Sequence, residues 1–254
     1  MTGFGAFLRK EFTEIRRTWR IWVIPGMLVF FGVTSPIIAA LTPALVRSMA
    51  TSQPGLVIQI PPPTARDAYV QFIKSLDQLV LIAIIITGAG VVSGERSSGT
   101  AILALTKPLS RGAFVVTKVL SQTMLLVVAT ALGTAVCLAV TAVVFDAAGA
   151  AHLVTAVALW LVYAVLLIAV MTLFSAAFQS RGAAAGAGLG FYFLTLLLGA
   201  WGPAARYSFL GLMLATQKAL VFESQPLGWQ LATAVVATGV VTVAAMGIFE
   251  RREL

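Results

Sequence analysis

The chain has 254 residues, of which 59% are hydrophobic and only 10% are charged, and its mean hydropathy is +0.98. This composition is too apolar for a soluble domain and indicates a polytopic membrane protein. The net charge of +8 does not indicate nucleic acid binding, because no segment could form a folded basic domain.

The N-terminal residues 1–20 are expected to form an amphipathic helix that lies in the membrane interface. Their apolar side chains fall on one arc at helical spacing, whereas the arginines fall outside it. Glu11 projects into the apolar arc, where a carboxylate is costly unless it finds a donor or extends to the headgroups. Both alternatives stay open.

Six intervals contain no Asp, Glu, Lys or Arg, namely 21–46, 78–94, 119–145, 153–180, 182–205 and 224–249. Each is near or above the roughly 20 residues that cross a bilayer as a helix. Such continuous apolar runs exclude a β-barrel, whose strands alternate in polarity. We expect an all-α membrane fold, a single transmembrane domain over 1–254 with spans near 21–46, 78–94, 115–145, 153–180, 182–203 and 226–249.

Two segments between spans are expected on the external side. The proline-rich residues 47–77 form the longer loop, in which 65–76 could be a surface helix. Residues 203–225 are too apolar for an exposed loop and too interrupted to span, which predicts a re-entrant or interfacial hairpin before the sixth span, with an additional surface helix as the alternative. Twelve of the 17 Lys and Arg residues fall on the side of the termini, which predicts that both termini are cytoplasmic.

Several kinds of chemistry are missing from the sequence. The six intervals contain no ionisable carboxylate or amine, which argues against a transporter driven by protons or ions. The nucleotide-binding pattern GxxxxGK[ST] is absent, and His152 is the only histidine. We therefore expect no enzymatic activity, no cofactor and no metal site in this chain, so any energy for transport comes from a partner.

The segment between the second and third spans, 95–111, has features that a simple connector does not need. Gly99 allows a turn, Thr100 can cap a helix, and the apolar residues that follow predict a short helix that ends before Pro108. An interfacial helix that only joins two spans is the alternative.

The residue pattern of this segment resembles a sequence motif of a known family. Glu95, Gly99-Thr100, Leu103 and Pro108-Leu-Ser-Arg111 are similar to the loop signature of permease subunits of second-class (ABC-2 type) ATP-binding-cassette exporters. Lys10-Glu11-Phe12 is similar to the start of their interfacial connecting helix. The order of entry helix, six spans and external hairpin also agrees with that family.

The resemblance implies a permease subunit that forms a translocation path across the cytoplasmic membrane. Its 95–111 loop would be a cytoplasmic coupling helix that docks on a separate ATPase, where ATP and Mg bind. The implied coupling residues are Glu95, Arg96, Gly99, Thr100, Leu103, Pro108 and Arg111. Two ATPase subunits and a second permease copy or paralogue are the implied partners, besides the lipid bilayer.

In such a family helices two and five line the path, which places Thr87, Tyr192 and Thr195 along it. These side chains suit an amphipathic or hydrophobic substrate, whose identity the sequence does not give. A non-transporting membrane scaffold that anchors an ATPase-like partner is the alternative function. The two differ in whether ATP hydrolysis by the partner responds to a transported compound.

Overall fold

The computed structural model describes residues 3–50, 61–94, 111–145, 149–220 and 227–251, and within these ranges it contains helices and no strand. In chain order the elements are α1 (Gly3–Arg17), α2 (Arg20–Ala50), α3 (Ala65–Ser75), the π-helical turn η1 (Leu76–Val80), α4 (Leu81–Gly88), α7 (Arg111–Phe145), α8 (Ala150–Ala177), α9 (Arg181–Gly199), α10 (Gly202–Tyr207), the 3₁₀ turn η2 (Phe209–Gly211), α11 (Leu212–Leu220) and α12 (Gly228–Arg251).

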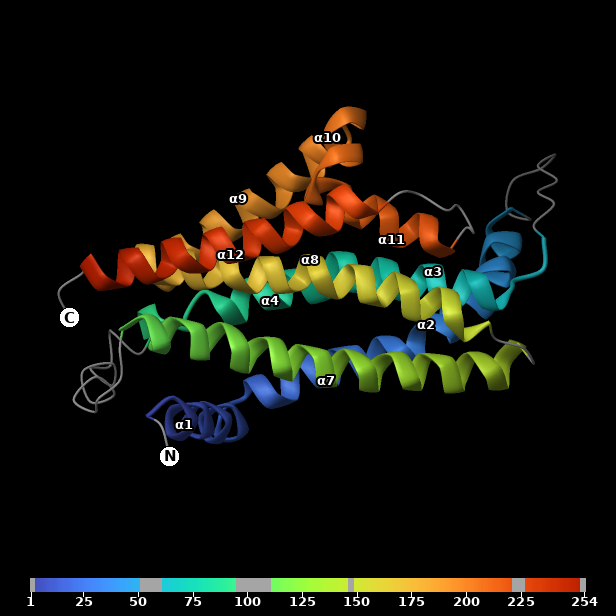
Figure 1. Cartoon of the computed structure of the whole chain (residues 1–254). Helices are drawn as coiled ribbons and strands as arrows, with labels where there is room; N and C mark the ends of the chain where they lie inside the picture. Colours follow the sequence, from blue (N-terminus) through green and yellow to red (C-terminus); the bar gives the residue numbers. More distant parts are fainter. Residues whose placement is uncertain (1–2, 51–60, 95–110, 146–148, 221–226, 252–254) are drawn as a thin grey trace.

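Six helical stretches of the described chain are long and apolar enough to cross a membrane: Ile21–Ser48, Ala65–Gly88, Gly112–Phe145, Ala150–Ala177, Arg181–Gly199 and Gly228–Arg251. This confirms the expected all-helical, six-span fold. Figure 1 shows the long helices running side by side, with the N- and C-termini at the same end of the bundle. We call this end the terminal end and the opposite end the distal end.

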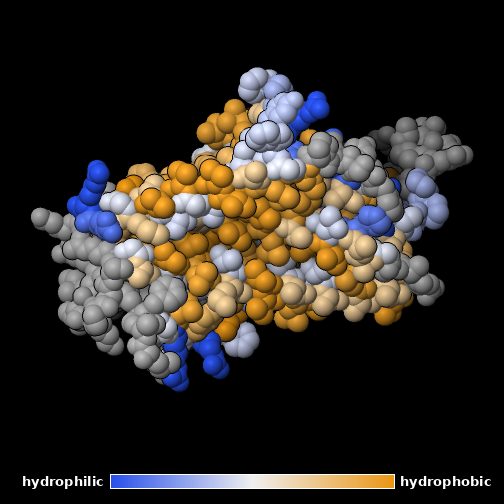
Figure 2. Space-filling view, viewed as in Figure 1, coloured by the Kyte–Doolittle hydropathy of each residue, from blue (hydrophilic) through white to orange (hydrophobic). Residues whose placement is uncertain are grey.

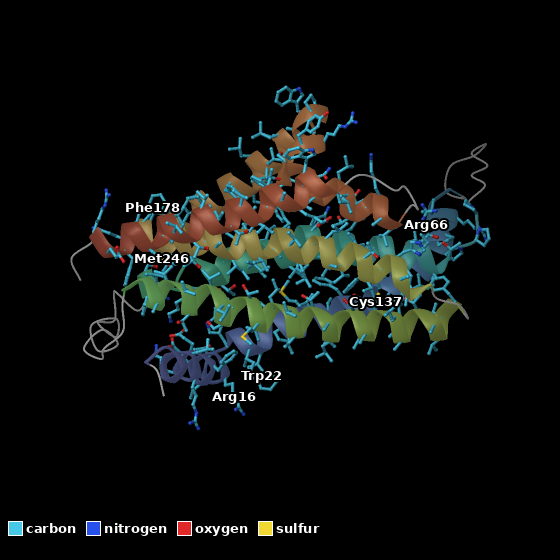
Figure 3. All side chains as sticks on the ribbon, in the orientation of Figure 1. Arg16, Trp22, Arg66, Cys137, Phe178 and Met246 are labelled. Carbon is cyan, nitrogen blue, oxygen red and sulfur yellow. The ribbon has the colours of Figure 1, made fainter. Side chains whose placement is uncertain are left out.

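The surface agrees with a membrane location. Figure 2 shows a broad hydrophobic region over the middle of the bundle, with hydrophilic side chains near its ends. In Figure 3, Arg16 points away from the helices at the terminal end, and Arg66 lies at the distal end. The entry helix α1 lies across the terminal end instead of along the bundle (Figure 1), while Trp19 and Trp22 beyond it are exposed. This is the arrangement that an interfacial helix requires.

The second span begins earlier than the sequence predicts. It starts at Ala65 and runs through α3, η1 and α4 to Gly88, so the segment expected as part of an external loop belongs to a helix of the bundle. Phe72 and Ile73 of α3 are fully buried. The predicted start of the second span at residue 78 is wrong, because that boundary follows the last charged residue, Asp77. Three of the four charged side chains between residues 65 and 77 are exposed, whereas the apolar face of the helix packs against the bundle.

The segment before the sixth span is helical where it is described. Residues 202–220 form α10, η2 and α11, and α11 packs against α8 and α3. Figure 1 shows α9 leaning away from the other helices, with α10 at its raised tip and α11 returning to the bundle. The remainder of the expected 203–225 hairpin lies outside the described residues.

Helices α2 and α7 cross with almost no space between their backbones. A methyl group on Gly32 would lie 2.6 Å from the carbonyl oxygen of Gly133. One on Gly133 would lie 2.8 Å from the carbonyl oxygen of Leu28. Small residues at a crossing allow this approach, which gains van der Waals contact in a membrane where helices have little hydrophobic drive to associate.

We expect Gly133→Ala to destabilise the protein by roughly 1–3 kcal/mol, because the methyl group meets backbone atoms that cannot rotate away. The midpoint of thermal unfolding in mild detergent would measure this. The matched control is Gly26→Ala on α2, since nothing lies within 4 Å of the position its methyl group would take. Equal midpoints for the two variants would contradict the close crossing.

Candidate functional site

The expected coupling residues are mostly outside the described part of the chain. Glu95, Arg96, Gly99, Thr100, Leu103 and Pro108 lie there, and of Arg111 only the backbone, which begins α7, is described. The structure does describe the two ends from which this segment leaves the bundle. Both are at the terminal end, beside α1 (Figure 1).

The chain that leads into the segment is held by α8. The hydroxyl oxygen of Ser175 accepts hydrogen bonds from the backbone N–H groups of Val92 (2.9 Å) and Ser93 (3.1 Å). The same hydroxyl donates to the Ala89 carbonyl oxygen at 2.9 Å. One buried side chain therefore satisfies backbone groups that the end of the helix would leave unpaired.

Arg181, the first residue of α9, packs against the same stretch. A methyl group on Gly94 would lie 2.9 Å from a terminal guanidinium nitrogen of Arg181, and one on Gly90 would lie 3.2 Å from its Cδ. The missing side chains of Gly90 and Gly94 make room for the arginine. The chain is thus fixed to α8 and α9 immediately before residue 95.

The start of α7 is joined to α1 by a buried ion pair. Lys118 Nζ lies 2.7 Å from Glu11 Oε2, and the two side chains are only 3% and 4% exposed. Lys10 Nζ lies 3.1 Å from Glu11 Oε1 and 2.6 Å from Glu14 Oε2. Of the two alternatives for Glu11, the structure selects a donor within the protein over the headgroups. Phe12, the third residue of the connecting-helix motif, is half-buried.

A small apolar cluster lies close to this ion pair, since the Nζ atom of Lys118 is 5.4 Å from the ring centroid of Phe114. Phe114 of α7 and Phe249 of α12 stack with their ring centroids 5.0 Å apart. The buried members of the cluster come from α7, α8, α12 and the chain after α4: Val91, Val92, Phe114, Val115, Ala176, Ala245 and Phe249. Because packed side chains are hard to compress, a displacement at either end of the 95–111 segment would pass to several helices together.

The expected path residues lie in two places. Tyr192 and Thr195 line a cavity of about 500 Å³ toward the distal end, between η1, α9, η2 and α11. Thr87 does not reach it. Its hydroxyl donates to the Ala83 carbonyl oxygen at 2.7 Å, and it borders a separate small pocket that also contacts Gln122.

Hydrogen bonds join the walls of this distal cavity. The Tyr192 hydroxyl donates to the backbone carbonyl of Asp77 at 2.8 Å, which ties α9 to the π-helical turn η1. Thr195 Oγ1 lies 2.7 Å from the Tyr163 hydroxyl oxygen and donates to the Tyr192 carbonyl oxygen at 2.7 Å. A π-helical turn inside an α-helix often occurs at a functional site.

Asp77 is a site residue that the sequence pattern did not predict, as are Lys118 and Ser175 at the terminal end. It lines the distal cavity, and its side chain is buried, with the residue 5% exposed. Neither carboxylate oxygen has a well-formed hydrogen bond, although the side chain of Gln217, which also lines the cavity, lies close enough to interact with the carboxylate. The expectation that the six spans contain no ionisable carboxylate was therefore wrong. The helical spacing of Ala68, Phe72 and Leu76 could have extended the span to include Asp77.

The described residues contain no group of three or more His, Cys, Asp and Glu that could hold a metal ion. Among the described residues that line the distal cavity, Asp77 is the one charged group.

Comparisons with known proteins identify sequences that are similar to this chain. A family model described as ABC-2 family transporter protein matches residues 6–217. The chain is also 22% identical over 185 residues to the uncharacterized transmembrane protein YxlG of Bacillus subtilis (strain 168), and the alignment covers 73% of this chain and 72% of that protein. The family match begins within α1, contains the 95–111 segment and extends into α11, so it includes every described residue that lines the distal cavity.

Proposed function

This chain belongs to the ABC-2 family of transporter proteins, and we propose on that premise that it is the permease subunit of an exporter driven by separate ATPase chains. Membership makes it a multi-pass transport component of an ABC transporter that is not itself catalytic, and it implies association with ABC ATPase subunits. ATP and Mg would bind in those partner chains.

The proposal rests on one observation: the described chain on each side of the 95–111 segment is held against neighbouring helices. Ser175 and Arg181 hold the chain before it, and the Glu11–Lys118 pair holds the helix after it. A loop with rigid attachments can pass the motion of a docked partner to the helices, whereas a loosely attached loop would absorb it.

We assign the coupling contacts to Glu95, Arg96, Gly99, Thr100, Leu103, Pro108 and Arg111. An apolar side chain such as Leu103 would enter a groove of the ATPase, and the charged residues would pair at its rim. Lys10, Glu11 and Phe12 of α1 would lie beside this contact. The presence of α1 at the same end supports this arrangement (Figure 1).

The proposed assembly has two permease chains and two ATPase chains in the cytoplasmic membrane. The second permease is another copy of this chain or a paralogue. Both termini would face the cytoplasm, as the twelve-to-five distribution of basic residues favours. The path would run between the second and fifth spans, with Thr87, Tyr192 and Thr195 along it.

Purification in mild detergent together with the ATPase encoded nearest to this gene tests the proposal. We expect a complex with two copies of each kind of chain, whose ATP hydrolysis rises when an exported compound is added. A complex whose hydrolysis is indifferent to every transported compound would favour a non-transporting scaffold. Failure to retain any ATPase would contradict both functions.

A further inference from the structure

We propose that the distal cavity binds a hydrophobic organic cation, with the carboxylate of Asp77 as its counter-ion. As a statement about the exported substrate, this rests on the proposed transport function. The binding site itself is independent of the ATPase and is argued from the cavity alone.

Asp77 is buried and lacks a counter-ion among the described residues that line the cavity. Its side chain is buried within a candidate membrane span, and neither carboxylate oxygen has a well-formed hydrogen bond. A buried charge without a partner is costly in this environment, and ionisable residues inside spans commonly face a cavity where they meet a partner. Asp77 lines a cavity large enough to admit one. The described residues that line the cavity include no basic side chain, so a ligand of opposite charge would supply the counter-ion.

The size and lining of the cavity also suit an organic cation. Its volume of about 500 Å³ lies within the range of small-molecule sites. Leucine and methionine side chains form much of its wall, and the polar groups gather near Asp77: Gln78, Tyr192, Thr195 and Gln217. An apolar wall with one charged point suits a ligand that has a large hydrophobic part and a single positive charge.

The same lining disfavours other ligand classes. A divalent metal ion requires several oxygen ligands, and within the described part of the chain Asp77 is the only acidic residue that lines the cavity. An anion would meet a charge of its own sign. A neutral hydrophobic compound would leave the buried carboxylate without a counter-ion.

Tyr192 adds a second feature that suits a cation. Its hydroxyl is occupied by the hydrogen bond to the Asp77 carbonyl oxygen, which fixes the ring against the cavity on the side of η1. An aromatic ring attracts an organic cation through its electron-rich face. Tyr192 therefore holds the turn that carries Asp77 and places an aromatic residue in the lining of the same cavity.

The test uses two ions of the same shape and opposite charge, tetraphenylphosphonium and tetraphenylborate, with the purified full-length permease. Equilibrium dialysis in a non-ionic detergent measures binding after subtraction of the amount held by protein-free micelles. We expect the wild-type protein to bind the phosphonium at least about 10-fold more tightly than the borate. Asp77→Asn should weaken phosphonium binding by roughly 30-fold or more, because the counter-charge is lost.

Two further variants keep the result interpretable. Asp67→Asn makes the same change at an exposed position of α3 away from the cavity, and it should bind like the wild type. Gln217→Lys retains Asp77 but introduces a competing amine close to the carboxylate, so it should also weaken binding of the phosphonium. It provides the test of charge if Asp77→Asn fails to fold.

Equal binding of the two ions by the wild type, or full phosphonium binding by a folded Asp77→Asn or Gln217→Lys protein, would overturn the inference. These results leave the proposed function intact if the ATPase complex still forms. Conversely, a permease that binds the phosphonium selectively but retains no ATPase would refute the proposed function and leave the binding site standing.

Discussion

Replacing Lys118 with methionine is expected to lower the stability of the protein by about 3–5 kcal/mol, because it leaves Glu11 as a buried carboxylate without its closest partner. Lys10 Nζ remains 3.1 Å from the other oxygen of Glu11, which places the loss toward the lower end of that range. Methionine keeps most of the volume of the lysine stem, so the effect reports the charge. Thermal unfolding in mild detergent would measure it.

The double variant Glu11→Gln/Lys118→Met should recover much of the lost stability, since neither buried charge then remains. Lys10→Met is the matched control for the loss of an amine. Its side chain is 41% exposed, and exposed ion pairs contribute about 1 kcal/mol or less. If Lys118→Met unfolds at the temperature of Lys10→Met, the buried pair does not hold α1 to α7.

The second large effect is expected at Leu103. Leu103→Asp should weaken binding of the ATPase by about 5- to 150-fold, because a carboxylate would be forced into an apolar groove. Glu95→Ala should act in the same direction through the loss of a rim charge. Titration of the purified permease with the ATPase, with hydrolysis measured on the same samples, distinguishes weaker binding from uncoupled binding.

Neither substitution lies in a predicted span, so both proteins should insert and accumulate as the wild type does. Ser97→Ala serves as a control with little expected effect. In a Cys137→Ala background, Ser98→Cys should react with an impermeant maleimide only after cells are opened, and Ser52→Cys should react in intact cells. Unchanged assembly, hydrolysis and export for Leu103→Asp would reduce 95–111 to a connector, and external labelling at position 98 would exclude docking on a cytoplasmic ATPase.

The sequence predicts the parts of this fold that depend on long apolar runs. Six spans follow from six uncharged intervals, because lipid tolerates only helices of that length with their backbone groups satisfied internally. The start of the second span could not be found in this way. Arg66 and Lys74 interrupt the apolar run, although both lie on the exposed face of a helix whose other face is buried.

The candidate site was predictable only where a local pattern marked it. Glu11 stood out on its own helix because it broke an amphipathic arc, but its partner Lys118 belongs to a distant helix and follows from packing alone. Ser175 gave no signal, since a serine in an apolar helix commonly bonds to its own backbone. Tyr192 and Thr195 were placed on the path by resemblance, and the structure brings them to one cavity with Asp77.

The π-helical turn at Leu76–Val80 changes the directions in which the side chains of the second span point before and after it. An α-helix advances about 100° per residue, so one extra residue in a turn offsets the faces before and after it by about that angle. Phe72 before the turn and Ile85 after it nevertheless both belong to the large buried apolar cluster inside the bundle. The extra residue of this turn therefore sets the angle between the face that carries Asp77 and the buried face of α4. Deleting one residue of the turn after Gln78 would rotate Asp77 and Gln78 together relative to α4 and so change the lining of the cavity.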